Sequence, residues 1–407
     1  MQRTRAYDRL VSVELKNMDD KNMDDQRMDD KSMDHNKPRA IDEIDLLRGF
    51  GVLGVIAIHT TGYFTQIKSY NTLVLLNLWT DIFSQFAVPL FILISGFVLA
   101  RNYSHHFSYM NFYKKRIRSI IPQYLIFSIL YTMFNNWGVI QSNSINANLS
   151  LLLNNILNSN ASYHLWFFSI IIQLYILYPI VIKIYNFFKS INKEELLIAL
   201  LFILQTSWMV GLHASFLPFI TLNFISFLFY FGLGIYTCDH YTQMRKCFNP
   251  RLTPLYLISV LALTLASSFF IIIGLTTGYR YTSIPAYFFI GAELVYPLLR
   301  VSTFLLLFSL AASLIGKRSI LSKVVHRLGD YSFGIYLIHI FFNQYAIIVL
   351  KNNAIDYNNW PYYPIVFVTT VVSSYLAVRL ISYIPFSYYF IGNSNRSKAF
   401  KKTSTTC

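Results

Sequence analysis

The chain has 407 residues, of which 55% are hydrophobic and 13% are charged, and its mean hydropathy is +0.43. Soluble domains carry roughly a quarter charged residues, so this composition excludes an ordinary soluble protein and indicates a membrane protein. The net charge of +15 comes from basic residues that lie between apolar runs. That distribution is a topology signal, and we expect no nucleic-acid partner.

Residues 1–40 form a polar segment that contains a five-residue repeat. The repeat runs KNMDD, KNMDD, QRMDD and KSMDH from Lys16 to His35. Five residues advance a helix by about 500°, so the methionines cannot form one apolar stripe. We predict a disordered cytosolic tail. The alternative is a tract whose length varies between strains, because gain or loss of a five-residue unit keeps the reading frame.

Scanning for apolar runs of about 20 residues predicts roughly ten membrane-spanning helices. They lie near 46–66, 82–100, 119–137, 164–187, 196–211, 219–237, 253–275, 296–315, 331–350 and 362–386. Ser95 and Gly96 in the second run favour close helix packing. The predicted fold is an all-α integral membrane protein, a bundle of about ten transmembrane helices. Its membrane domain covers residues 41–390, and residues 391–407 form a short basic cytosolic tail.

Lysine and arginine predict the orientation. They number 18 in one alternating set of segments, which comprises 101–118, 188–195, 238–252, 316–328 and the tail from 392. They number three in the other set, which comprises 67–81, 138–163, 212–218, 276–295 and 351–361. Because basic loops stay in the cytosol, both termini should be cytosolic.

The three cysteines, Cys238, Cys247 and Cys407, all fall in segments predicted to be cytosolic. We therefore expect no disulfide framework. Cys238 and Cys247 together with His240 do not match the ligand spacing of a zinc site, so we predict no bound metal.

The first predicted span, LLRGFGVLGVIAIHTTGYF, contains two ionisable side chains, Arg48 and His59. Eleven residues make about three turns plus 20°, so both lie on one face, about 16 Å apart along the axis. Asp45 is close enough to pair with Arg48. Such groups usually face a bundle interior or a wet cavity, although Arg48 could snorkel and His59 could bond a neighbouring helix. Burial disfavours the charged imidazole, and a neutral imidazole can act as a general base.

Five stretches resemble, in order, the acyltransferase-3 family of bacterial integral membrane acyltransferases. They are LLRGFGVLGVIAIH (46–59), VPLFILISGFVLA (88–100), FYKKRIRSIIPQY (112–124), YHLWFFSIIIQLY (163–175) and YSFGIYLIHIFF (331–342). The resemblance implies a multi-pass protein of the bacterial cell membrane. It also implies transfer of an acyl group, usually acetyl from cytosolic acetyl-CoA, to a hydroxyl of a cell-surface or lipid-linked glycan.

In that family setting, His59 matches the proposed catalytic histidine and Arg48 matches the arginine paired with it. The family often shows Arg-x-x-Arg before a proline, and the matching positions here are Lys115 and Arg118, with Arg116 between them. Lysine keeps the charge but loses the bidentate fork that suits phosphate. We predict that these three residues hold the phosphates of acyl-CoA, a substrate rather than a bound cofactor. The alternative for each is a positive-inside stop signal.

Four further candidates lie in or beside predicted spans. His164 and Trp166 are predicted to contact the glycan acceptor, and the alternative is an aromatic anchor at the membrane interface. His339 either lines the site or makes an interhelical hydrogen bond. Glu293 is a site-lining candidate, and the alternative is a structural ion pair with Arg300.

The predicted function is a membrane-embedded O-acyltransferase. His59 would take the proton of the acceptor hydroxyl as it attacks the thioester, and Arg48 would orient the assembly or stabilise developing negative charge. The alternative is a transporter of a glycan or lipid-linked sugar, since ten spans with intramembrane polar groups also suit transport. A sensor would need a soluble output domain, which the sequence does not predict. Expected partners are acyl-CoA, the glycan and membrane lipids, and a separate protein could complete the transfer.

Overall fold

The computed structural model describes residues 41–63, 71–104, 107–213, 224–276, 286–317 and 319–392. The regular structure of this part of the chain is helical and includes no strand. The disordered tail predicted for residues 1–40 lies outside it. So does the predicted basic tail 391–407, apart from its first two residues.

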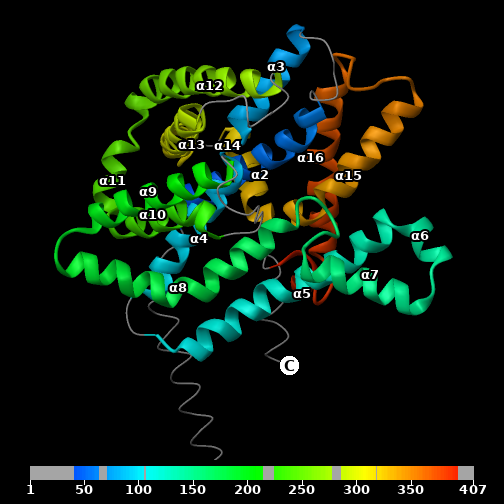
Figure 1. Ribbon diagram of the computed structural model, residues 1–407, viewed down its shortest axis with the longest axis horizontal. Coiled ribbons are helices and arrows are strands. Elements are labelled where there is room, and N and C mark those ends of the chain that lie inside the picture. The colour runs from blue at the N-terminus through cyan, green and yellow to red at the C-terminus, as the bar shows by residue number, and fades with distance from the viewer. Residues whose placement is uncertain are drawn as a thin grey trace, which may run out of the picture. The chain divides into compact units, whose positions relative to one another are not determined.

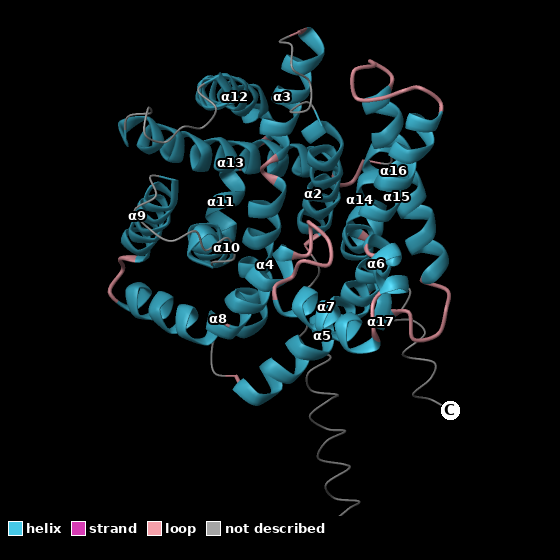
Figure 2. Ribbon diagram, turned by 45° about the vertical axis from the view of Figure 1, so that its right-hand side comes forward, coloured by secondary structure: helices cyan, strands magenta, loops and turns pink. Residues whose placement is uncertain are grey.

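The helices follow one another along the chain as Figures 1 and 2 show. The first half contains α2 (Asp42–Thr61), α3 (Thr72–Ser84), α4 (Ala87–Tyr103), α5 (Tyr109–Asn135), α6 (Trp137–Ser142), α7 (Ile145–Leu157), α8 (Trp166–Ser190) and α9 (Glu194–His213). The second half contains η2 (Phe224–Phe227), α10 (Leu228–Asp239), α11 (Tyr241–Cys247), η3 (Pro250–Leu252), α12 (Thr253–Thr276), α13 (Ala286–Leu314), α14 (Ile320–Asp330), α15 (Ser332–Asn352), α16 (Tyr362–Ile381) and α17 (Tyr388–Ile391).

Nine helical segments in the described part are long and apolar enough to cross a membrane. One of them joins α3 and α4 into a segment of 32 residues, Thr72–Tyr103. A further apolar helix, Phe224–Asp239, is shorter. Each of the ten predicted runs corresponds to an apolar helix in the described part of the chain, nine of them long enough to cross a membrane, and the all-α fold is confirmed.

Three of the segments predicted to connect the spans are largely helical. Each of these helices begins with a side-chain cap, and the polar residues that follow the cap continue the helix. Segments 67–81, 101–118 and 138–163 contain most of α3, the start of α5, and the α6–α7 pair. A capping side chain precedes each of α3, α5 and α7, and it accepts a hydrogen bond from a backbone N–H near the start of that helix. The three caps are Asn71, Ser108 and Ser144. The basic cluster 114–118 is consequently part of helix α5 and not of a loop.

Helix α2 packs against α3, α4, α13, α14, α15 and α16. Its contact with α14 depends on glycine at both sides. A Cβ on Gly49 would lie 2.1 Å from the carbonyl oxygen of Val325, and one on Gly329 would lie 1.8 Å from that of Asp45. A glycine also permits close packing of α4 against α10, where a Cβ on Gly96 would lie 2.2 Å from the carbonyl oxygen of Phe231. The close packing predicted at Gly96 is therefore confirmed.

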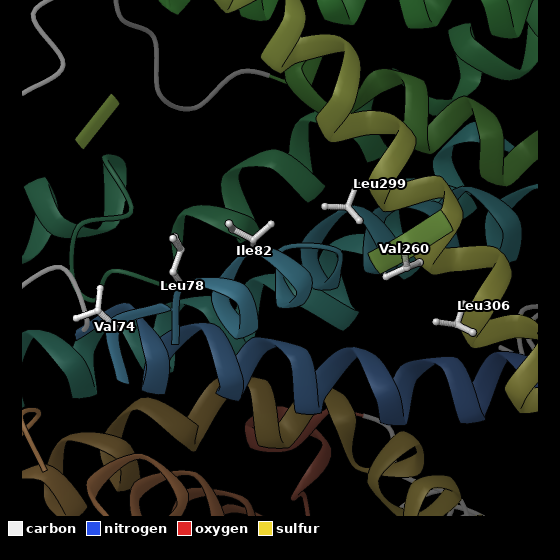
Figure 3. Packing of buried hydrophobic residues seen from close by; sticks show 6 residues of the cluster. All are labelled: Val74, Leu78, Ile82, Val260, Leu299 and Leu306. Carbon is white, nitrogen blue, oxygen red and sulfur yellow. The ribbon is translucent and has the colours of Figure 1, made fainter. Parts of the chain in front are cut away.

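A cluster of buried aliphatic side chains holds α12 and α13 beside α3. Figure 3 shows its six members, which come from these three helices: Val74, Leu78, Ile82, Val260, Leu299 and Leu306. Each of them is at most 5% exposed, and because lipid tails are as apolar as these side chains, the cluster stabilises the bundle through van der Waals packing. This packing fixes α13 with respect to the segment that contains α4, which matters because both line the site.

Candidate active site

Three histidines that are far apart in the sequence lie together. His59 is near the end of α2, His164 precedes α8, and His339 is in α15. The ring of His339 lies 5.3 Å from that of His59 and 5.2 Å from that of His164, measured between centroids. Tyr163 packs edge-on against His59 at 4.9 Å. The fold thus joins three of the sequence-predicted site residues into one cluster.

Hydrogen bonds fix one nitrogen of two of these rings. His339 Nδ1 lies 2.7 Å from the carbonyl oxygen of Tyr336. Because a carbonyl can only accept, His339 Nδ1 carries a proton, and Nε2 of the neutral ring offers a lone pair. His164 Nδ1 lies 3.0 Å from Ser162 Oγ. Nε2 of both rings is buried and has no partner within hydrogen-bond distance among the described residues.

A cavity of about 260 Å³ adjoins the cluster, and we call it the histidine cavity. Its lining side chains are Val55, Ile58, His59, Gln85, Val88, Pro89, His164, Trp166, Phe167, Phe227, Arg300 and Tyr336. His59 is partly exposed to this space, whereas His339 is fully buried behind His59 and His164. Trp166 stacks on Phe227 at 5.8 Å. Three predicted residues therefore line the cavity, and the fourth supports two of them.

A second cavity of about 320 Å³, which we call the basic cavity, contains Arg48 and Arg116 in its wall. Its other polar lining includes Ser95, Ser119 and Asp330. Phe167 and Tyr336 belong to the walls of both cavities and form the partition between them. The two spaces are therefore neighbours, divided by two aromatic side chains.

Helix α2 contributes to both cavities, with Arg48 in one wall and His59 in the other. Arg48 Nη1 donates to Asp45 Oδ1 at 3.0 Å, so the predicted pair with Asp45 is confirmed. Arg48 lies within the basic cavity and not in the wall beside His59, which makes it suited to bind a ligand there rather than to act on the group that His59 deprotonates.

The three basic residues predicted to bind acyl-CoA lie on different sides of α5. Lys115 and Arg118 are exposed and line neither cavity, whereas Arg116, between them, is partly buried in the wall of the basic cavity. Three aromatic rings surround its guanidinium at 5.7–5.9 Å: Tyr103, Phe112 and Tyr175. Its buried Nε has no hydrogen-bond partner among the described residues. A positively charged, partly desolvated fork of this kind suits a phosphate group.

Glu293 does not line the histidine cavity, but Arg300, which lies seven residues later in α13, does. Glu293 is 3% exposed and exerts an electrostatic effect on Arg300. From the sequence, Arg300 is expected only as a structural partner for Glu293. The sequence contains the signal that identifies Arg300 as a site residue, because an arginine inside an apolar run usually faces a functional cavity. Gln85, Phe167 and Tyr336 gave no such signal.

One group of potential metal ligands is present among the described residues, formed by Glu194, Glu195 and His240. His240 Nε2 lies 3.3 Å from Glu194 Oε1 within the group, and Tyr236 donates to Glu195 at 3.2 Å, whereas Glu194 Oε2 has no hydrogen-bond partner among the described residues. The group is separate from both cavities. It gives the candidate active site no metal.

A family model described as an acyltransferase domain matches residues 41–379, which is more than four-fifths of the chain. The match includes both cavities and the three clustered histidines, apart from Gly392 in the wall of the basic cavity. Neither the curated proteins nor the solved structures contain a match to this chain.

Proposed function

Because this chain belongs to the acyltransferase-3 family, and is by that membership a membrane acyltransferase, we propose that it carries out O-acyl transfer from acyl-CoA. The acceptor is a hydroxyl of a cell-surface or lipid-linked glycan, and the acyl group is acetyl by default. The observation that carries the proposal is the pairing of two neighbouring cavities, one lined by arginines and the other by histidines.

The donor binds in the basic cavity. Arg48 and Arg116 provide guanidinium forks for the phosphates of CoA, and the aromatic rings around Arg116 keep its fork in place. Lys115 and Arg118, exposed on the same helix, add a positive field that attracts the donor. The thioester end of the donor reaches the histidine cavity past Phe167 and Tyr336, which line both spaces.

His59 acts as the general base in the histidine cavity. It takes the proton of the acceptor hydroxyl while that oxygen attacks the thioester carbon. The tetrahedral intermediate then collapses with cleavage of the carbon–sulfur bond, and the CoA thiolate leaves and recovers the proton from the imidazolium. The acylated glycan and CoA–SH are the products. His339, in ring contact with His59 and anchored through Nδ1 to Tyr336, holds the His59 ring in place.

The acceptor binds beside Trp166 and His164. An indole face can stack on a sugar ring, and the imidazole of His164 provides a polar group in the cavity wall. Both features suit a glycan better than an apolar acceptor.

We place the protein in a bacterial cell membrane with both termini in the cytosol, so that the basic cavity opens toward acyl-CoA. Reporter fusions near residues 150 and 245 test this orientation. Opposite sides for the two fusions support it, and the same side for both would contradict it.

The function is tested by the chemistry of the surface glycan. Wild type, His59→Gln and the control His240→Gln are produced in a host that lacks the gene, and the glycan is compared by mass before and after mild alkali. Alkali-labile acyl esters with wild type and His240→Gln, but not with His59→Gln, are expected. A glycan of unchanged mass that is less abundant at the surface would instead indicate a transporter.

A further inference from the structure

Arg300 is the cation in the wall of the histidine cavity. It lies in the middle part of α13, three residues after Pro297, and shares the cavity wall with His59, His164 and Gln85. Arg48 and Arg116, by contrast, line the basic cavity. Arg300 is therefore the arginine in the wall of the proposed acceptor site, and the catalytic steps above do not use it.

The guanidinium of Arg300 is held in a defined position by two tyrosines. Nη1 donates to the hydroxyl of Tyr230 at 3.1 Å. The rings of Tyr230 and Tyr296 lie 5.9 and 5.8 Å from its central carbon. A guanidinium carries five N–H donors, so the bond to Tyr230 leaves donors for a ligand. Such a pre-positioned fork is how proteins recognise carboxylates and phosphates.

The charge balance around Arg300 favours an anionic ligand. A cation inside a membrane-spanning segment is costly and usually lines a functional cavity with a counter-charge. Glu293 offsets part of this charge from within α13. Among the described side chains that line the histidine cavity, however, none is acidic. The side chains that line the cavity therefore include an arginine and no carboxylate, and the carboxylate of Asp81 lies behind Gln85, whose Nε2 donates to it at 3.2 Å.

We propose that the acceptor carries an anionic group, a carboxylate or a phosphate, and that Arg300 binds it while Trp166 stacks on the sugar. This inference rests on the proposed function, because only that function makes the ligand of this cavity the acyl acceptor. A neutral sugar needs no buried cation, because hydroxyls are satisfied by groups such as Gln85 and the histidines. Arg300 is thus a specificity residue, and it determines which glycans reach His59.

The experiment measures binding without catalysis. The melting temperature of the detergent-purified protein is followed with glucuronate, glucose 6-phosphate or glucose at equal ionic strength. We expect at least one of the two anions to raise Tm by about 1–2 °C near saturation, and glucose to raise it less. A response to glucuronate alone identifies a carboxylate of an acidic sugar, and a response to glucose 6-phosphate alone identifies a phosphate.

Three variants assign the effect to Arg300. The anion-dependent shift should vanish in Arg300→Gln and fall by at least half in Arg300→Lys, which keeps the charge but loses the fork. It should persist in Arg116→Gln, which removes one of the two arginines of the basic cavity. If Arg300→Gln does not fold, Arg300→Lys provides the test. An anion-dependent Tm shift as large in Arg300→Lys as in wild type overturns the proposal. So does the absence of any anion shift in wild type.

Two further variants separate this inference from the proposed function. His59→Gln should lose acyl transfer and keep the anion-dependent shift. Glu293→Gln should increase the shift, because the removed carboxylate offsets the charge of Arg300. If wild type transfers no acyl group but still shows a shift that depends on Arg300, the proposed function fails and the anion site stands. If transfer occurs without such a shift, only the anion site fails.

Discussion

The two cavities share a partition of two aromatic side chains, yet their polar groups differ in kind and in position. The basic cavity contains Arg48 from the second turn of α2 and Arg116 from the second turn of α5, together with Asp330 at the end of α14. The histidine cavity has His59 from the last turn of α2 and Arg300 from the middle part of α13, with His339 fully buried behind His59 and His164. The two cavities therefore differ in their ionisable groups, which are two guanidinium groups and a carboxylate in one and imidazoles with one guanidinium in the other.

This difference assigns a separate step to each space. A multiply charged donor suits the cavity whose wall contains two arginines, and proton transfer suits the cavity whose wall contains imidazoles. If the assignment is correct, substitutions in one cavity change donor binding, and substitutions in the other change the chemical step.

The largest effect is expected from His59→Gln. Loss of a general base should lower kcat about 10²- to 10⁴-fold and leave the affinity for acyl-CoA unchanged, because the donor binds in the other cavity. The measurement is transfer of radiolabelled acetyl from acetyl-CoA in membranes, combined with binding of a CoA thioether analogue. A variant that lost donor binding along with kcat would argue against two separate spaces.

Arg116→Gln should act on the donor alone. Removal of a charge-assisted contact with phosphate costs about 1.5–3 kcal/mol, so KM for acyl-CoA should rise about 10- to 100-fold while kcat changes little. The matched control is Lys115→Gln, one residue earlier and exposed, which should change KM less than Arg116→Gln does. Equal effects for the two variants would show that only the general positive field matters.

Phe167→Ala tests the partition. Removing the ring joins the two cavities and admits water to the thioester, so transfer should fall several-fold while hydrolysis of acyl-CoA rises. The control is Phe187→Ala in the same helix, whose ring is 62% exposed and distant from the partition. Unchanged rates of both transfer and hydrolysis in Phe167→Ala would mean that the ring does not separate the substrates.

The smallest effect on rate is expected from Gly49→Ala, next to Arg48. Its Cβ would meet the carbonyl oxygen of Val325 at 2.1 Å, so α2 and α14 must separate at a cost of about 1–3 kcal/mol. Thermal stability should fall, and KM for acyl-CoA should rise slightly because the wall of the basic cavity shifts. Gly62→Ala is the control, since nothing lies within 4 Å of its added Cβ. Equal stability of the two variants would contradict this packing.

Much of the fold could be read from hydropathy, because a lipid environment demands long apolar helices. The ends of those helices could not be read in this way. Helix α5 begins at Tyr109, about ten residues before the predicted run at 119–137, since Ser108 caps it and polar residues continue it. The start of α3 at Thr72 was missed for the same reason, because Asn71 caps that helix.

The sequence predicted only part of the candidate active site. Each histidine of the cluster stood out as a polar group in or beside an apolar run, but their convergence depends on how α2, α8 and α15 pack together. Periodicity placed Arg48 and His59 on one face, and it could not reveal that Phe167 and Tyr336, from two other helices, divide the space beside that face. The choice of Arg116 over Lys115 and Arg118 likewise depends on which side of α5 faces the bundle.

The division of labour between the two cavities is tested most directly by a cryo-electron microscopy map of the His59→Gln protein with acetyl-CoA. The account predicts the diphosphate of CoA between Arg48 and Arg116, with the thioester passing Phe167 and Tyr336 toward position 59. Acetyl-CoA bound outside the basic cavity, or with its thioester directed away from the histidine cavity, would contradict it.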